Sequence, residues 1–160
     1  MGLFNFLKGN KNDLNWDELR LTEEVYPANS ISVFMTQSER GKPSTGWVDL
    51  AYEEYAYKNY CPYNLQFNIW IDESTPEDLD MGTIEDYFTN ILKEECVVHA
   101  VARVVTDFGM IMDLYIDNPE FAQIKLGELS ESNDKLVEFG CGFNHDPKWK
   151  EYNRITKMVG

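Results

Sequence analysis

The clearest hydrophobic pattern lies between residues 64 and 95 of the chain. Residues 64–72 alternate apolar and polar side chains, which predicts a strand with one face in the core. From Thr83 onward the apolar residues recur three and four positions apart, which predicts an amphipathic helix over residues 83–95 with Thr83 as its cap. The expected core face of this helix consists of Ile84, Tyr87, Phe88, Ile91 and Leu92.

Two further alternating segments predict a β-hairpin. They span residues 97–105 and 110–116. The even-numbered apolar residues of both segments are expected to face one core, and a three-residue loop is needed to pair even positions with even positions. This register sets Arg103 opposite Asp113 and His99 opposite Asp117. These charged residues are then ordinary cross-strand neighbours on the face away from the core.

The rest of the chain predicts shorter elements. They are a helix over residues 13–20, strands over 30–37 and 45–52, a helix over 117–132, a strand over 135–143 and a terminal helix that begins at 146–147. Asn118 and Pro119 are the cap and first residue of the 117–132 helix. Cys141 is expected to face the core from the 135–143 strand, and Trp149 to pack the terminal helix.

The order of these elements predicts the fold class. Residues 64–143 run strand, helix, strand, strand, helix, strand, which is the ferredoxin-like (βαββαβ) arrangement of an antiparallel sheet with both helices on one face. The earlier hairpin is expected to extend this sheet or to cover its second face. Residues 1–12 are expected to form a loose tail, and residues 13–160 a single α+β domain with an added C-terminal helix.

Composition and charge indicate a single folded domain and disfavour nucleic acid and membranes as its partners. The 160 residues are 43% hydrophobic, which suffices for one folded domain, and no apolar run approaches the length of a spanning helix. The N-terminus lacks the basic start and cleavage site of a signal peptide, so a cytoplasmic location is expected. With 28 acidic and 14 basic residues, the net charge of −14 disfavours nucleic acid and anionic membranes. A basic protein partner, such as a nuclease or a toxin, is the kind of ligand that this charge favours.

Several residues suggest catalytic or metal chemistry, but their spacing argues against it. Cys96 and His99, with Cys141 and His145, resemble zinc ligands, yet the strand pattern turns them to different faces. The same argument counts against a Cys–His nucleophilic pair. The motif "DFG" at residues 107–109 has no other kinase motif beside it, and the acidic loop 72–80 lacks the glycine and glutamate of a calcium loop. No metal, cofactor or catalytic residue is therefore expected.

Several phrases of the sequence resemble a known bacterial family. They are "ISVFMTQSERGKPSTGWVDLA", "TIEDYFTNIL", "VVHAVARVVTDFGMIMDLYI" and "HDPKWKEYNRI". Together they resemble the family called domain of unknown function 695, over about residues 15–155, with Asp-Pro-Lys-Trp-Lys-Glu-Tyr as the most specific phrase. That family has no established activity, so the resemblance implies a fold and no catalytic residues. The association of such domains with one similar to the inhibitor of ribonuclease E implies protein binding.

A binding surface is the function that the aromatic residues favour. Tyrosine and tryptophan are enriched where proteins recognise partners, and acidic neighbours would attract a basic one. The expected partner-binding residues are Tyr52, Glu53, Glu54, Tyr55, Tyr57, Tyr60, Trp70, His99, Arg103, Asp113 and Tyr115. An open alternative is that these rings only cover the second face of the sheet. We therefore expect a non-enzymatic adaptor or inhibitor; the alternative is a small-molecule-binding or hydrolytic protein with a site around His99, Arg103 and Asp113, or around Cys141 and His145.

Overall fold

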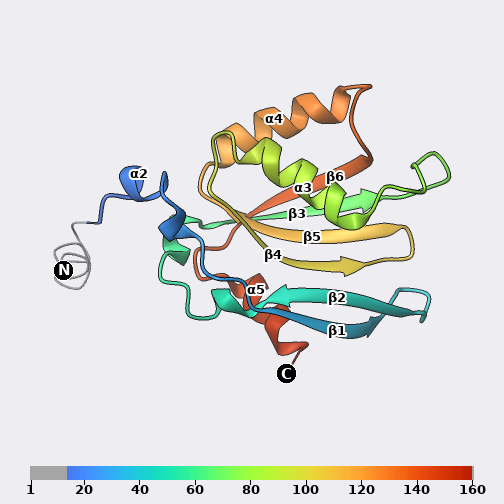
Figure 1. Ribbon diagram of the computed structural model, residues 1–160, viewed down its shortest axis with the longest axis horizontal. Coiled ribbons are helices and arrows are strands. Elements are labelled where there is room, and N and C mark those ends of the chain that lie inside the picture. The colour runs from blue at the N-terminus through green and yellow to red at the C-terminus, as the bar shows by residue number, and fades with distance from the viewer. Residues whose placement is uncertain (1–13, 160) are drawn as a thin grey trace.

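A computed structural model describes residues 14–159 as one six-stranded sheet with helices on both faces (Figure 1). The strands are β1 (Ile31–Gln37), β2 (Pro43–Asp49), β3 (Tyr63–Trp70), β4 (Val98–Val105), β5 (Gly109–Ile116) and β6 (Glu138–His145). They lie in the order β1-β2-β4-β5-β3-β6, and every neighbouring pair is antiparallel. The α+β class and the antiparallel sheet are thus confirmed. The predicted tail, residues 1–12, lies outside the described residues.

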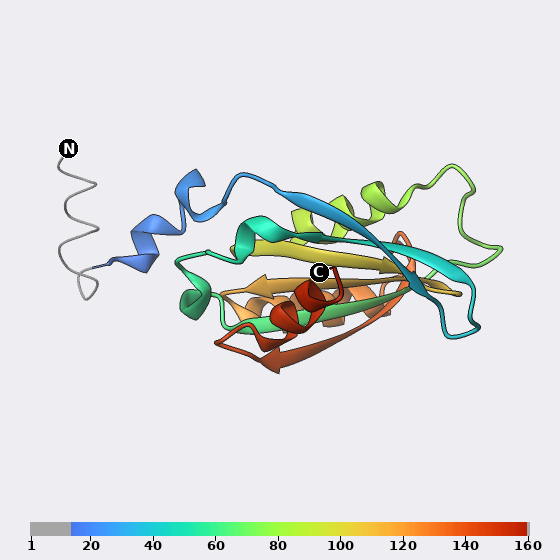
Figure 2. The ribbon, with the colours of Figure 1, turned by 90° about the horizontal axis from the view of Figure 1, so that it is seen from below.

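The helices divide between the two faces of the sheet. The α-helices within residues 14–159 are α2 (Trp16–Leu19), α3 (Met81–Leu92), α4 (Pro119–Glu131) and α5 (Lys150–Lys157), with short 3-10 turns at Glu23–Val25, Leu50–Tyr52 and Lys58–Tyr60. Helices α3 and α4 lie side by side over one face in Figure 1. In Figure 2, α5 (red) lies in front of the sheet and α4 (orange) behind it. The predicted hairpin β1–β2 extends the sheet next to β4.

The first core lies between the sheet and α3 and α4. The alternation of β3 turns Leu65, Phe67 and Ile69 into this core, as predicted, where they meet Ile84 and Phe88 of α3. Helix α3 begins two residues earlier than predicted, because the carboxylate of Asp80, and not Thr83, caps it by accepting the Thr83 N–H at 2.7 Å. Helix α4 begins at Pro119 with Asn118 as its cap, as predicted.

The second core fills the other face of the sheet and is mostly aromatic. Trp149 is fully buried, stacks on Tyr115 with ring centroids 4.0 Å apart, and donates its indole N–H to the Cys61 carbonyl at 3.0 Å. Helix α5 begins at Lys150, not at 146–147 as predicted. Asp146 accepts the backbone N–H groups of Lys150 and Glu151 and the Tyr115 hydroxyl, so the first turn of α5 is tied to the sheet. The predicted role of Trp149 in packing the terminal helix is confirmed.

The predicted register of the β4–β5 hairpin is wrong. A β-bulge between Ala100 and Ala102 shifts the pairing, so that Ala100 pairs with Leu114 while Ala102 pairs with Asp113. Because Val101 is an extra residue, the even-numbered and odd-numbered side chains of β4 exchange faces after it. The hairpin loop is also shorter than predicted: Thr106 donates its backbone N–H to the Gly109 carbonyl at 2.9 Å, which leaves Asp107 and Phe108 as the loop. Arg103 therefore lies opposite Met112, not opposite Asp113, and the bulge turns its side chain toward the helices.

One further pairing and the burial of one cysteine also differ from the prediction. His99 lies opposite Tyr115 and not opposite Asp117, because the strands are in a different register beyond the bulge. Cys141 is exposed and not in the core, because β6 is an edge strand that, within residues 14–159, pairs only with β3.

Candidate partner-binding surface

Four of the predicted partner-binding residues are buried. Tyr52, His99, Asp113 and Tyr115 each expose 5% or less of their surface, because α5 and the segments before β1 and after β2 cover that face of the sheet. In the structure these four side chains are therefore not placed to contact a partner, and the rings of Tyr52 and Tyr115 lie in the core on the second face of the sheet.

His99 is held as a neutral side chain between two tyrosines. Its Nδ1 lies 2.9 Å from the Tyr52 hydroxyl and its Nε2 lies 2.9 Å from the Tyr55 hydroxyl. Tyr55 donates its own proton to the Val25 carbonyl at 2.7 Å, so its oxygen can only accept from His99. The proton is thus on Nε2, and Nδ1 accepts from Tyr52. Burial, with the positive charge of Lys93 as a smaller cause, lowers the pKa of His99 to about 3.

Arg103 and Asp113 lie on opposite faces of the sheet. The Arg103 guanidinium donates to the Glu85 carboxylate of α3 at 2.8 Å. Asp113 accepts instead from the side-chain amides of Asn64 and Gln66, at 3.3 and 3.2 Å. Burial raises the pKa of Asp113 above its usual value, and the two amide bonds oppose that shift. His99, Arg103 and Asp113 therefore do not form one site.

The remaining predicted residues do not form one patch either. Glu53 and Glu54 are exposed, whereas Tyr57 and Tyr60 are half-buried and pack against Trp16. Trp70 is exposed at the far end of β3, where its ring covers Gly140 of β6.

The structure does not assemble the residues that resembled a zinc site. The thiol of Cys96 is buried against the Asn118 carbonyl, and both nitrogens of His99 are used by tyrosines. Cys141 and His145 are exposed on β6. Among residues 14–159, no three His, Cys, Asp or Glu side chains are placed to hold a metal ion.

An apolar row on strand β1 is the most unusual surface feature. Ile31, Val33 and Met35 expose 51%, 71% and 68% of their surface, and because they alternate along the strand they share one face. We call these three residues the apolar shelf. Strand β1 carries no charged residue. Within residues 14–159 it pairs only with β2, so it is an edge strand without the charges that usually protect one. The sequence predicts the strand but not the shelf, because Phe34 on the opposite face is also apolar.

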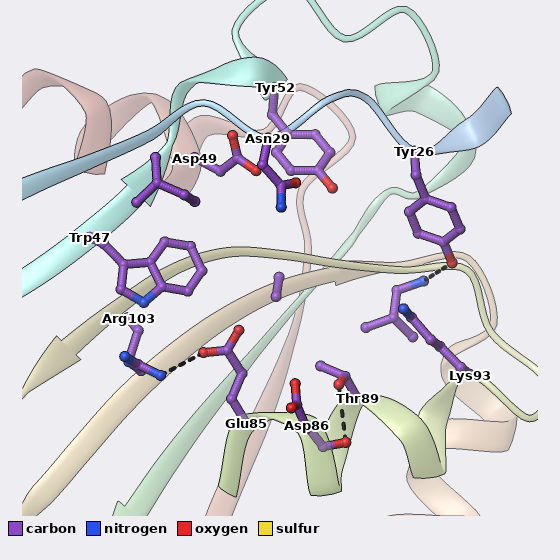
Figure 3. A pocket seen from close by; sticks show the side chains of 13 residues that line it. Tyr26, Asn29, Trp47, Asp49, Tyr52, Glu85, Asp86, Thr89, Lys93 and Arg103 are labelled. Atoms are coloured by element: carbon purple, nitrogen blue, oxygen red, sulfur yellow. Dashed lines mark hydrogen bonds and ion pairs between the residues drawn. The ribbon is translucent and has the colours of Figure 1, made fainter. Parts of the chain in front are cut away.

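A cavity of about 430 Å³ lies beside the shelf (Figure 3). It forms because β2 pairs with β4 only from Gly46 to Val48 and then diverges from it. The lining residues come from α3, β2, β4 and the segment before β1: Tyr26, Asn29, Ile31, Trp47, Asp49, Tyr52, Glu85, Asp86, Thr89, Lys93, Val98, Ala100 and Arg103. Since Ile31 belongs to both, the shelf and the cavity are continuous.

The two cations of the cavity are already engaged. Arg103 pairs with Glu85 and lies over the Trp47 ring, with 5.7 Å to the centroid. Lys93 lies over the Tyr26 ring at 5.1 Å. Burial raises the pKa of Glu85 above its usual value, with Arg103 opposing the shift. Two carboxylates of the cavity, Asp49 and Asp86, form no ion pair with any residue from 14 to 159.

Searches against protein-family models, curated proteins and solved structures gave no significant match to this chain. The resemblance to domain of unknown function 695 therefore stays a prediction. No helix in the described part of the chain is long and apolar enough to cross a membrane.

Proposed function

We propose that this protein is a non-enzymatic adaptor or inhibitor that binds a basic, partly apolar segment of another protein across the apolar shelf. The observation that carries this proposal is the row of Ile31, Val33 and Met35, which is exposed on an uncharged edge strand. Exposed apolar patches on folded proteins mark interaction sites more often than scattered apolar residues do.

The charge of the molecule supports a basic partner. The chain carries a net charge of −14, and the cavity next to the shelf contains Asp49, Asp86 and the ion-paired Glu85. A positively charged segment would be attracted to this region over about the Debye length, roughly 8 Å at physiological salt. An acidic segment would be repelled, so charge selects the partner while the shelf provides the apolar contact.

The apolar contact is large enough to matter. Full burial of a Val, Ile or Met side chain contributes about 1.5–3 kcal/mol, and each shelf residue has half or more of its surface available. Much of this gain is offset by the loss of translational and conformational freedom on association. A contact of moderate affinity is the expected result.

We also propose that the protein has a ferredoxin-like core and is located in the cytoplasm. The element order β3-α3-β4-β5-α4-β6 and the strand order β4-β5-β3-β6 support a ferredoxin-like core to which the β1–β2 hairpin adds a binding surface. The free thiols of Cys61, Cys96 and Cys141 suit a reducing compartment such as the cytoplasm. The resemblance to domain of unknown function 695 fits a bacterial binding module.

The test uses synthetic peptides of defined chemistry. Fluorescence anisotropy would compare three labelled peptides: a lysine–leucine peptide, a glutamate–leucine peptide and a lysine–serine peptide of equal length. The lysine–leucine peptide should bind tightest, and its affinity should fall as the salt concentration rises from 0.05 to 0.5 M. The double variant Val33→Thr, Met35→Gln keeps the charge and should weaken this binding about tenfold, or roughly 1.4 kcal/mol.

The matched control is Ile124→Gln, which removes an apolar side chain that is 66% exposed on α4. It should bind the peptide as the wild type does. Equal binding of the acidic and the basic peptide would overturn the choice of partner. A concentration-dependent dimer that the shelf variant abolishes, measured by light scattering, would assign the shelf to a second copy of the chain instead.

A further inference from the structure

The carboxylate of Asp49 is a buried acceptor that the protein itself uses only in part. Asp49 is 2% exposed, and its Oδ1 accepts the backbone N–H groups of Ser30 at 2.8 Å and Ala51 at 3.0 Å. Its Oδ2 accepts no hydrogen bond from residues 14–159. In the same part of the chain, no fully buried side-chain oxygen or nitrogen lacks a partner, so Oδ2 is not sealed inside the protein. Since Asp49 lines the cavity, Oδ2 faces that space.

The rest of the cavity wall suits an organic cation. In Figure 3, Asp49 lies with Asn29 and Tyr52 on one side of the space, and Glu85 and Asp86 of α3 lie on the other. Tyr26, Trp47 and Tyr52 make part of the wall apolar, which suits the aliphatic stem of a long side chain. A volume of about 430 Å³ admits one long side chain with water around it.

The native cations leave this acceptor free. Arg103 is held by Glu85, and Lys93 lies over Tyr26, so neither is paired with Asp49. The carboxylates of the cavity also do not converge on a point that would suit a metal ion, as judged from residues 14–159. An ammonium or guanidinium group on a flexible stem can reach Asp49 and donate hydrogen bonds to this one carboxylate. A metal ion would need several ligands around it.

We infer that the cavity receives the ammonium or guanidinium group of one lysine or arginine side chain from the bound segment, with Asp49 as the acceptor. This inference rests on the proposed function, because the cation belongs to a segment that lies across the apolar shelf. The cavity adds a requirement that the apolar shelf does not impose. The partner must carry a basic residue at one position, beside the apolar residues that contact Ile31. The backbone N–H groups of Ser30 and Ala51 hold Asp49 in place before the cation arrives.

The test uses small probes that are independent of the shelf. The probes are N-acetyl-lysine N-methylamide and its neutral analogue N-acetyl-norleucine N-methylamide, followed by amide chemical shifts in two-dimensional NMR. The lysine probe should give saturable shifts at the amides of Ser30 and Ala51, and the norleucine probe should not. Asp49→Asn keeps an acceptor for both amides and should weaken binding of the lysine probe about tenfold, the scale of one charge-assisted hydrogen bond. Glu128→Gln removes the same charge from an exposed position on α4 outside the cavity and should leave the affinity unchanged.

The results separate this inference from the proposed function. Equal shifts with both probes, or equal affinity of the wild type and Asp49→Asn for the lysine probe, would overturn the role of Asp49. If the lysine–leucine peptide still bound and still lost affinity with Val33→Thr, Met35→Gln, the proposed function would stand without the cation site. The comparison of the two probes on the wild type does not depend on how any variant folds.

Discussion

His99 makes the folded state sensitive to acid. The imidazole is fully buried and neutral, with Nδ1 accepting from Tyr52 and Nε2 donating to Tyr55. Protonation would place a proton on Nδ1. That proton would then face the Tyr52 hydroxyl proton, and the hydrogen bond between the two groups would be lost. The aromatic rings packed around the imidazole offer no carboxylate to balance the charge; they belong to Tyr26, Tyr52, Tyr55 and Trp149.

The size of the effect follows from the difference between the two pKa values. In the unfolded chain His99 titrates near 6.5, whereas burial lowers its pKa in the folded protein to about 3. Between these values the unfolded state binds one proton more than the folded state, so the free energy of unfolding falls as the pH falls. The slope is about 1.4 kcal/mol per pH unit well below pH 6.5. From pH 7.5 to pH 5.0 the loss is about 2 kcal/mol.

Urea unfolding of the wild type and of His99→Gln at pH 7.5 and pH 5.0 measures this loss. Glutamine does not titrate, and the carboxylates common to both proteins cancel in the comparison. The stability difference between wild type and variant should therefore shift by about 2 kcal/mol against the wild type at pH 5.0. His145→Gln, at an exposed position, shows whether loss of any histidine has this effect.

A stability difference that stays within about 0.5 kcal/mol between the two pH values would refute the reasoning, because it would mean that His99 takes up its proton equally in both states. Imidazole ¹⁵N chemical shifts of the folded protein at pH 5.0 give an independent check. They should report a neutral ring with the proton on Nε2. A protonated ring at that pH would refute the assignment of the hydrogen bonds.

Three further predictions concern the fold. Gly109→Ala should destabilise the protein by about 3–4 kcal/mol in urea unfolding, since the added Cβ would lie 1.9 Å from the Ile69 carbonyl oxygen, at a φ of +156° that favours glycine. Asp146→Ala should cost about 2 kcal/mol in the same assay, because it removes the acceptor for the first two N–H groups of α5 and for the Tyr115 hydroxyl; a loss below about 0.5 kcal/mol would contradict this role. Cys141 should react with a thiol reagent in the folded protein, whereas the two buried cysteines should react only after unfolding, which timed labelling and mass spectrometry would check.

The local features of the fold could be predicted from the sequence. The period of the apolar residues identified β3 and α3, and Asn118 with Pro119 marked the start of α4. Trp149 was recognised as the residue that packs the terminal helix. These predictions succeeded because each depends on residues close together in the chain, where side-chain spacing and capping act directly.

The candidate site was decided by the tertiary structure. Alternation along a strand shows that it has two faces, but which face is covered depends on elements far away in the chain. The shelf is exposed because α3 and α4 lie over β3, β4, β5 and β6 and not over the β1–β2 hairpin, and the cavity exists because β2 leaves β4 after Val48. The bulge at Val101 has no sequence signature, yet it turns Arg103 toward Glu85 and leaves Asp113 on the other face. Pairing between distant segments therefore determined which charges meet, and the sequence alone could not specify it.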